Sequence, residues 1–208
     1  MRKMYISLIV LLLMLCAAGL AMLLWGAVFD QYLESNTVGQ NVVSLSAALN
    51  DKQLQKERNL ARWYNLTLRK EKPDTGFLSA YLQIMDFGAG RMGYLEIPAL
   101  SVLKPIAHET GNTQASDEVV HQFGTSLPVG GKHNCPVLYC GGEGDALAAG
   151  DAFSIHILDT VLTYQVAEMG DKMPKNQTGE DLCVLWFSSE EGALFITGVR
   201  TTKIVISG

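Results

Sequence analysis

The chain has 208 residues, of which 48% are hydrophobic, and its formal net charge at pH 7 is −5. Setting aside Arg2 and Lys3, which precede an apolar segment, changes that charge from −5 to −7 for the remainder. This acidic balance excludes nucleic acid and an anionic lipid surface as expected partners, because both attract clustered positive charge. About 180 residues follow the apolar segment, enough for one domain with a substantial core.

The N-terminal segment is long and apolar. Residues 4–29 carry no charged side chain, and a helix that crosses a bilayer needs about 20 such residues. Arg2 and Lys3 lie just before this segment, and the next basic residue is Lys52. Because positive flanks stay in the cytoplasm, the pattern predicts a cytoplasmic stub at residues 1–3, a single transmembrane anchor at 4–29, and an extracellular remainder.

Two other fates of this segment are less well supported. A cleaved signal peptide is the first, but the apolar run continues to Phe29, beyond the small residues around Ala18, and signal-peptide cores are shorter. Lipid modification of Cys16 is the second, and the bulky Leu15 before it disfavours that reading.

Residues 30–90 are predicted to be a helical stalk and lid-like region. Apolar residues near helical spacing favour one helix over residues 30–68, and residues 77–87 favour a shorter one. Between them, residues 69–76 contain Pro73 and Gly76, which are typical of a break. The first helix is expected either to stand off as a stalk or to pack on the following domain.

Residues 91–208 are predicted to be mostly β. Short apolar runs are separated by Gly, Pro and Asp, a pattern typical of a closed or nearly closed barrel. The expected strands cover residues 93–97, 101–106, 136–139, 152–158, 161–166, 182–187, 194–196 and 201–206. Asp159 and Thr160 suit a hairpin turn between two of them.

Three cysteines lie outside the apolar segment, namely Cys135, Cys140 and Cys183. Their odd number means that at least one thiol stays unpaired. Cys135, Cys140 and His133 are crowded into one short segment and lack the spaced pairs of a zinc site. We therefore expect no metal and no cofactor.

Several motifs occur in an order that resembles the sortases, and among them the class C, pilin-polymerising group. The resemblance runs from about residue 57 to the end of the chain. The run Gly124-Thr-Ser-Leu-Pro-Val-Gly-Gly131 is the most specific part. The other stretches are Tyr81-Leu-Gln-Ile-Met85, Met92-Gly-Tyr-Leu-Glu-Ile-Pro98, Lys104-Pro-Ile-Ala-His108, Phe153-Ser-Ile-His-Ile157, Thr163-Tyr-Gln-Val166 and Gly198-Val-Arg200.

The resemblance implies an eight-stranded sortase barrel. In active members of the family, a cysteine cleaves a sorting signal, forms a thioester, and passes the acyl group to an amine. That chemistry needs a thiolate, a histidine that protonates the leaving amine, and an arginine that stabilises the oxyanion.

All three groups are missing where the family places them. Gly141 stands at the histidine position, Phe187 at the cysteine position and Ala193 at the arginine position. The segment that follows Gly141 is also short, and the loop after Phe187 carries Glu190 and Glu191, whose charge would disfavour a thiolate. The pattern predicts a sortase homologue with a degenerate active site.

Three functions remain open from the sequence. The favoured one is a non-catalytic, membrane-anchored homologue of the Gram-positive cell surface, which binds a pilin, a sorting-signal peptide or an active sortase during surface-protein or pilus assembly. The second is a divergent active transpeptidase that uses Cys183 or Cys140 as its nucleophile. The third is a structural envelope protein that keeps only the fold.

Overall fold

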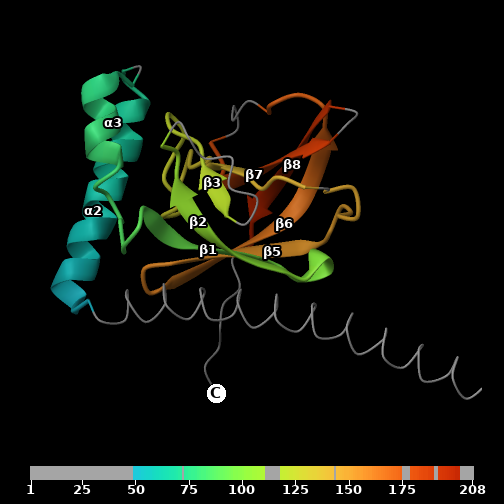
Figure 1. The fold of residues 1–208 in the computed structure, drawn as a ribbon, viewed down its shortest axis with the longest axis horizontal. Coiled ribbons are helices and arrows are strands. Elements are labelled where there is room, and N and C mark those ends of the chain that lie inside the picture. The colour runs from blue at the N-terminus through green and yellow to red at the C-terminus, as the bar shows by residue number, and fades with distance from the viewer. Residues whose placement is uncertain are drawn as a thin grey trace, which may run out of the picture. The chain divides into compact units, whose positions relative to one another are not determined.

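The structure of this protein is a computed structural model. It describes residues 49–71, 73–110, 118–142, 144–174, 179–189 and 192–201 (Figure 1). The predicted cytoplasmic stub at residues 1–3, the predicted anchor at 4–29 and the stretch 30–48 lie outside the described residues. No helix within the described part of the chain is long and apolar enough to cross a membrane.

Helix α2 (Asp51–Leu68) begins at a capping box. The Asn50 side chain accepts the backbone N–H of Gln53 at 3.0 Å, and the Gln53 side chain accepts that of Asn50 at 3.0 Å. These bonds satisfy two amide groups that a helix start leaves without a partner. Asn50 itself has extended backbone, with ψ 164°, so the prediction of one helix over residues 30–68 is wrong at this point.

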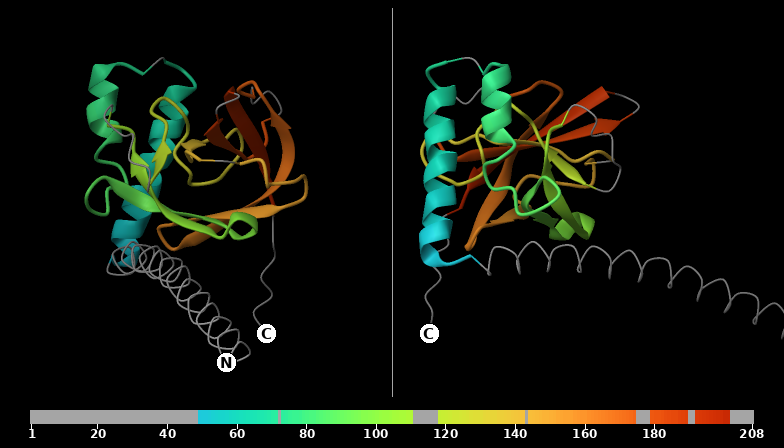
Figure 2. Two further views of the ribbon diagram at one scale, coloured as in Figure 1. Left: turned by 45° about the vertical axis from the view of Figure 1, so that its right-hand side comes forward. Right: turned by 60° about the vertical axis from the view of Figure 1, so that its left-hand side comes forward.

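Helix α2 packs against the barrel through one face. Leu54, Ala61 and Tyr64 are buried on that face. Next to them the buried Asn65 amide donates to the backbone carbonyl of Leu127 at 3.0 Å and accepts the Leu127 N–H at 2.7 Å. Figure 2 shows α2 and α3 on the same side of the barrel. Of the two expected roles for this helix, the described residues support packing on the domain.

Helix α3 (Thr75–Tyr81) is short and is capped by the side chain of Asp74, which accepts the Phe77 N–H at 2.9 Å. The predicted helix over residues 77–87 is wrong beyond Tyr81. Met85 has a left-handed backbone, with φ 58°, and its N–H donates to the Glu57 carboxylate on α2 at 3.0 Å. This contact turns the chain away from the helical path.

Eight strands close into a barrel in the order β1-β2-β3-β4-β7-β8-β6-β5 (Figure 1). Six of the eight pairings are antiparallel, whereas β2 with β3 and β4 with β7 are parallel. The strands are β1 (Arg91–Ile97), β2 (Val102–His108), β3 (Val119–His121), β4 (Val137–Tyr139), β5 (Ala152–Ile157), β6 (Thr160–Gly170), β7 (Leu182–Ser189) and β8 (Gly192–Arg200). A short 3₁₀ helix, η1 (Pro98–Leu100), joins β1 to β2.

Seven of the eight predicted strands overlap strands of this barrel, although β6 and β8 are longer than predicted. The sequence pattern did not predict β3, whose three residues are too few to show alternation. It also placed a last strand at residues 201–206, whereas β8 ends at Arg200 and Thr201 lies in no strand. Residues 202–206 of that prediction lie outside the described residues.

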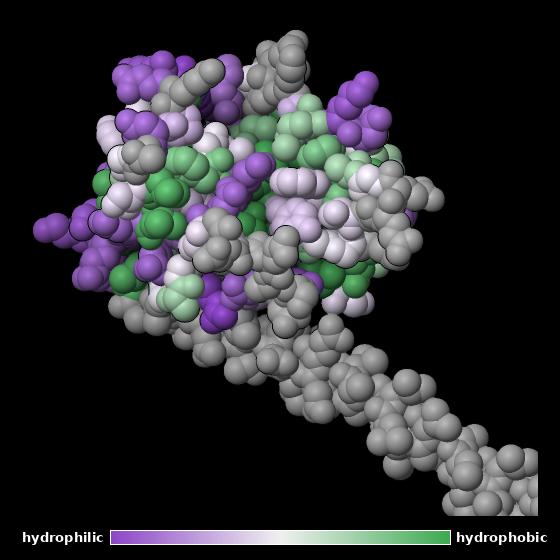
Figure 3. Space-filling view, turned by 45° about the horizontal axis from the view of Figure 1, so that its top comes forward, coloured by the Kyte–Doolittle hydropathy of each residue, from purple (hydrophilic) through white to green (hydrophobic). Residues whose placement is uncertain are grey.

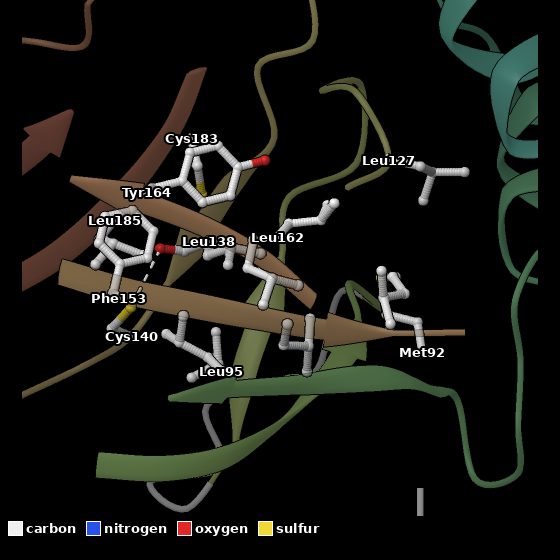
Figure 4. Packing of buried hydrophobic residues seen from close by; sticks show 14 of the residues in the cluster. Met92, Leu95, Leu127, Leu138, Cys140, Phe153, Leu162, Tyr164, Cys183 and Leu185 are labelled. Atoms are coloured by element: carbon white, nitrogen blue, oxygen red, sulfur yellow. Dashed lines mark hydrogen bonds between the residues drawn. The ribbon is translucent and has the colours of Figure 1, made fainter. Parts of the chain in front are cut away.

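The core is built from alternate residues of the strands. Phe153 and Tyr164 stack with ring centroids 5.3 Å apart, and Gly198 leaves room for them, since a β-carbon there would lie 2.5 Å from the Phe153 ring. Figure 4 shows these rings among other buried side chains. On the face drawn in Figure 3, by contrast, hydrophobic residues form separate patches between hydrophilic ones.

Candidate functional site

The candidate site lies at one end of the barrel, where β4 and β7 end and β8 begins. β4 and β7 run parallel, with Tyr139 in register with Trp186. The pairing continues one residue further, because the Cys140 N–H donates to the Trp186 carbonyl at 2.8 Å. This topology brings Cys140, Gly141, Phe187 and Ala193 to the same end of three neighbouring strands.

Gly141, at the predicted histidine position, begins a turn and contributes no side chain to it. Both Gly141 and Gly142 have left-handed backbone, with φ 59° and 61°, and open space surrounds the position of a β-carbon at each. Glycine adopts this conformation at little cost, whereas other residues are strained in it. The backbone of this turn is therefore suited to glycine rather than to histidine.

Phe187, at the predicted cysteine position, is a buried core residue that is 4% exposed. Its ring packs on the backbone of Gly144, where an added β-carbon would lie 2.5 Å from Cδ2 of Phe187. The aromatic ring thus fills the space between β7 and the turn after β4.

Ala193, at the predicted arginine position, is in register with Ser188, while Phe187 is in register with Leu194. Successive side chains of a strand point to opposite faces of a sheet. Phe187 and Leu194 pack with the core, so Ala193 belongs to the other face, together with the exposed Ser188. Sequence reasoning missed this difference in facing.

The fallback nucleophiles Cys183 and Cys140 are both buried in the core (Figure 4). Burial raises the pKa of the Cys140 thiol to about 12, and Cys140 donates its S–H to the Leu138 carbonyl at 3.5 Å. Burial also raises the pKa of Cys183 well above its usual value. Neither sulfur is a thiolate near neutral pH, and the thiolate is the nucleophilic form.

The cysteines outside the predicted anchor do not pair with one another. Cys135, Cys140 and Cys183 are free thiols, and burial raises the pKa of Cys135 to about 11. Among the described residues, no cluster of three or more His, Cys, Asp or Glu side chains could hold a metal ion.

Two histidines, His108 and His121, are buried next to Tyr81 of α3. The ring nitrogens of His108 lie 2.8 and 2.9 Å from the carbonyl oxygens of Gly90 and Ile84. Nδ1 of His121 lies 3.0 Å from the Tyr81 hydroxyl, and its Nε2 lies 2.8 Å from the Ser126 carbonyl. His121 thus joins β3 to Tyr81 of α3, and His108 joins β2 to the segment between α3 and β1, as expected for histidines that support the fold.

The two remaining histidines lie elsewhere. His156 on β5 stacks on Tyr94, with centroids 4.1 Å apart, and bonds the Glu96 carboxylate at 2.8 Å. His133 is exposed in a turn with φ 61°. Within the described part of the chain, no hydrogen bond links any histidine to Cys140 or Cys183.

An aromatic row that sequence reasoning missed crosses the strands at the site. Tyr139 and Trp186 meet edge to face with centroids 4.9 Å apart, and Trp186 stacks with Phe195 at 5.8 Å. These side chains alternate with core residues, so they lie on the outer side of β4, β7 and β8. Trp186 Nε1 is buried and has no hydrogen-bond partner in the described part of the chain. Gly170, in register with Phe195, has open space above it.

Comparison with known proteins finds class C sortases among solved structures. Sortase C-1 of Actinomyces oris is 30% identical, with a TM-score of 0.63 over 73% of this chain and 99% of that one. Sortase C of Streptococcus pneumoniae, a structure described for its insights into catalysis and pilin substrate specificity, is 27% identical, with a TM-score of 0.67 over 80% and 97%. Sortase C1 of Streptococcus agalactiae has a TM-score of 0.71 at 22% identity, over 80% and 99%, which bears on the fold alone. No protein-family model and no curated protein matches the sequence.

Proposed function

We propose that this chain, which belongs to the sortase family, is a non-catalytic homologue that binds partners during surface-protein or pilus assembly. In this proposal residues 4–29 anchor it in the cell membrane, residues 1–3 stay in the cytoplasm, and the barrel works outside the cell. Its partner is a pilin or sorting-signal peptide, or an active sortase.

The contact between Phe187 and Gly144 carries the proposal. Sortase chemistry requires a thiolate with access to a peptide carbonyl. Here an aromatic ring stands at the predicted cysteine position and is covered by the turn that should supply the histidine. The thiols of Cys140 and Cys183 are buried, and because burial raises the pKa of each they are protonated near neutral pH. Loss of these polar groups removes turnover and leaves the hydrophobic core of the barrel in place.

The aromatic row supports a binding role. Trp and Tyr contribute much of the free energy at protein interfaces, because each buries a large apolar area with little loss of side-chain freedom. Tyr139, Trp186 and Phe195 form a continuous row on the outer side of three strands, and the open position at Gly170 borders it. An extended peptide or a partner's loop fits such a surface.

An assay with the full-length chain tests the two halves of the proposal separately. The chain is incubated with a panel of sorting-signal peptides and an amine acceptor, with mass spectrometry to trap any thioester. Cys140→Ala and Cys183→Ala are run beside it. We expect no turnover and no adduct, together with peptide binding that is weakened about tenfold or more by Trp186→Ala and unchanged by Met169→Ala, an exposed residue on β6.

Two results would argue for the other functions. An adduct that one cysteine variant abolishes would identify that cysteine as the nucleophile of a divergent transpeptidase. Absence of both turnover and binding, to the peptides and to an active sortase, would favour a structural envelope protein.

A further inference from the structure

A hollow of about 790 Å³ lies between α2 and the barrel, away from the aromatic row. Its walls come from α2, from the turn at Val129–Gly131, from the start of β6 and from the end of β8. Small-molecule sites usually enclose about 300 to 1,000 Å³, so the hollow has the size of a ligand site.

Positive charge dominates the hollow. Arg58 and Arg62, one helical turn apart on α2, line it together with Arg200 at the end of β8. Arg58 is paired with Asp159 and also donates to the Thr160 hydroxyl at 3.3 Å. Arg62 is exposed and makes no hydrogen bond or ion pair with any described residue. Its guanidinium is therefore available to a ligand.

The side chain of Arg200 is positioned by its neighbours in the barrel. Its guanidinium lies 5.7 Å from the ring centroid of Tyr164, beside the Asp181 carboxylate, which accepts the Gly131 N–H at 2.9 Å. Gly130 covers this group, because a β-carbon there would lie 3.3 Å from Asp181 Oδ2 and 3.8 Å from Arg200 Nη1. Nη1 of Arg200 is buried and has no hydrogen-bond partner among the residues that the structure describes. The structure thus fixes a cation at the wall of the hollow.

The balance of charge limits what the hollow can bind. Among the described residues, the three guanidinium groups that line the hollow have two carboxylates beside them, Asp181 in the lining and Asp159 paired with Arg58, which leaves one positive charge in excess. A ligand with one negative charge neutralises this positive charge, whereas a dianion would leave an excess of negative charge next to the Asp181 carboxylate. Guanidinium matches the paired oxygens of carboxylate and phosphate groups.

The same hollow has an apolar wall formed by Val129, Val161 and Leu162. Val161 is 51% exposed, although it is β-branched and lies inside a strand. Hydrocarbon placed against this wall would be removed from water, which stabilises a complex in proportion to the area buried.

From these features we infer that the hollow is a binding site for a monoanionic ligand that carries a carboxylate or a phosphodiester next to an apolar group. Arg62 binds the oxygens, the partly buried Arg200 adds positive charge at the wall, and the exposed Val161 contacts the hydrocarbon. The inference is independent of the proposed partner-binding role, since it uses none of the residues of the aromatic row.

Calorimetric titration of the full-length chain, in an uncharged detergent at low salt, tests this site. The probes are hexanoate for the carboxylate, dibutyl phosphate for the phosphodiester, and hexanol as the uncharged control. We expect saturable binding of at least one anion and no binding of hexanol. The anion that binds shows whether the site takes a carboxylate or a phosphodiester. Arg62→Ala should weaken binding about tenfold or more, the usual worth of a charged hydrogen bond.

Matched variants test whether binding depends on residues of the hollow or only on the net positive charge of α2. Lys56→Ala removes one positive charge from an exposed position of α2 that does not line the hollow, and should leave the affinity unchanged. Val161→Asp should abolish binding, whereas Met169→Asp, on an exposed part of the same strand, should not. The inference is wrong if neither anion saturates, if hexanol binds as well, or if Lys56→Ala and Arg62→Ala weaken binding equally.

Discussion

Phe187 on β7 lies in direct contact with the backbone of Gly144, and no side chain fits between them. A β-carbon at Gly144 would stand 2.5 Å from Cδ2 of Phe187, below the distance that real β-carbons reach. Glycine at this position and the aromatic ring opposite it therefore depend on each other. The contact joins the turn after β4 to the end of β7, the two elements that carry the predicted histidine and cysteine positions.

Gly144→Ala should destabilise the fold by about 1 to 3 kcal/mol, the usual cost of overpacking a core. Urea unfolding followed by tryptophan fluorescence measures the change. Gly170→Ala is the control, because nothing lies within 4 Å of a β-carbon there. In the double variant Gly144→Ala with Phe187→Leu, the smaller side chain should return part of the lost stability. If the two substitutions are additive, the contact does not couple these positions.

Asn65 should be among the most sensitive polar residues of α2. Its buried amide bonds both backbone groups of Leu127, and it donates to the Asn134 side chain at 2.9 Å. Asn65→Ala leaves these groups without partners, and each buried unsatisfied group costs about 1 to 3 kcal/mol. We expect a loss of at least about 2 kcal/mol in urea unfolding.

Asn59→Ala serves as the comparison on the same helix. Asn59 is exposed, and among the described residues its side chain bonds that of Gln55 alone. A change within about 0.5 kcal/mol is expected there. Because Ala has a higher helix propensity than Asn, a loss in Asn65→Ala cannot come from propensity, and equal losses in the two variants would mean that the buried amide bonds of Asn65 add no specific stability.

Much of the barrel could be predicted from local pattern. In β5, Phe153, Ile155 and Ile157 are buried and alternate with less buried residues, a period that the sequence displays directly. β3 was missed because three residues show no period and their partners β2 and β4 are remote in sequence. The helix limits at Asn50 and Tyr81 depend on individual side-chain contacts, which a hydrophobic pattern does not reveal.

The site was harder to predict than the barrel. The positions of Gly141, Phe187 and Ala193 in the sequence were enough to place them near the ends of three strands. Those positions were not enough to show that the Phe187 and Ala193 side chains lie on opposite faces of the sheet, because this depends on the register between β7 and β8. The row of Tyr139, Trp186 and Phe195 has no local signal at all, since the parallel pairing of β4 and β7 assembles it.

His121 should make stability depend on pH. Burial lowers the pKa of His121 to about 4 from its usual 6.5, so between these values the unfolded chain binds a proton that the folded chain does not. The contribution of this group is fully present above pH 6.5 and is lost as the pH falls toward 4, by roughly 3 kcal/mol in total. Stability should therefore rise with pH over that interval.

Nuclear magnetic resonance titration of the His121 ring in the native chain measures this pKa directly. Urea midpoints between pH 4.5 and 7.5 should also change less in His121→Gln than in the wild type. His133→Gln, at an exposed position, should keep the wild-type dependence on pH. A native His121 that titrates near 6.5 would contradict the expectation.

The free thiols should resist alkylation while the chain is folded. Raising the pKa of Cys140 from 9.0 to about 12 lowers its thiolate fraction near neutral pH about a thousandfold, and burial also limits access to it and to Cys183. Iodoacetamide at pH 7.5, followed by mass spectrometry, should label neither residue in the native chain and both in urea. Fast native labelling of Cys140 alone would show an activated thiol at the end of β4. That result would contradict the burial of Cys140 and would also remove one physical argument against catalysis, because a reactive sulfur would then lie beside the position of the missing histidine.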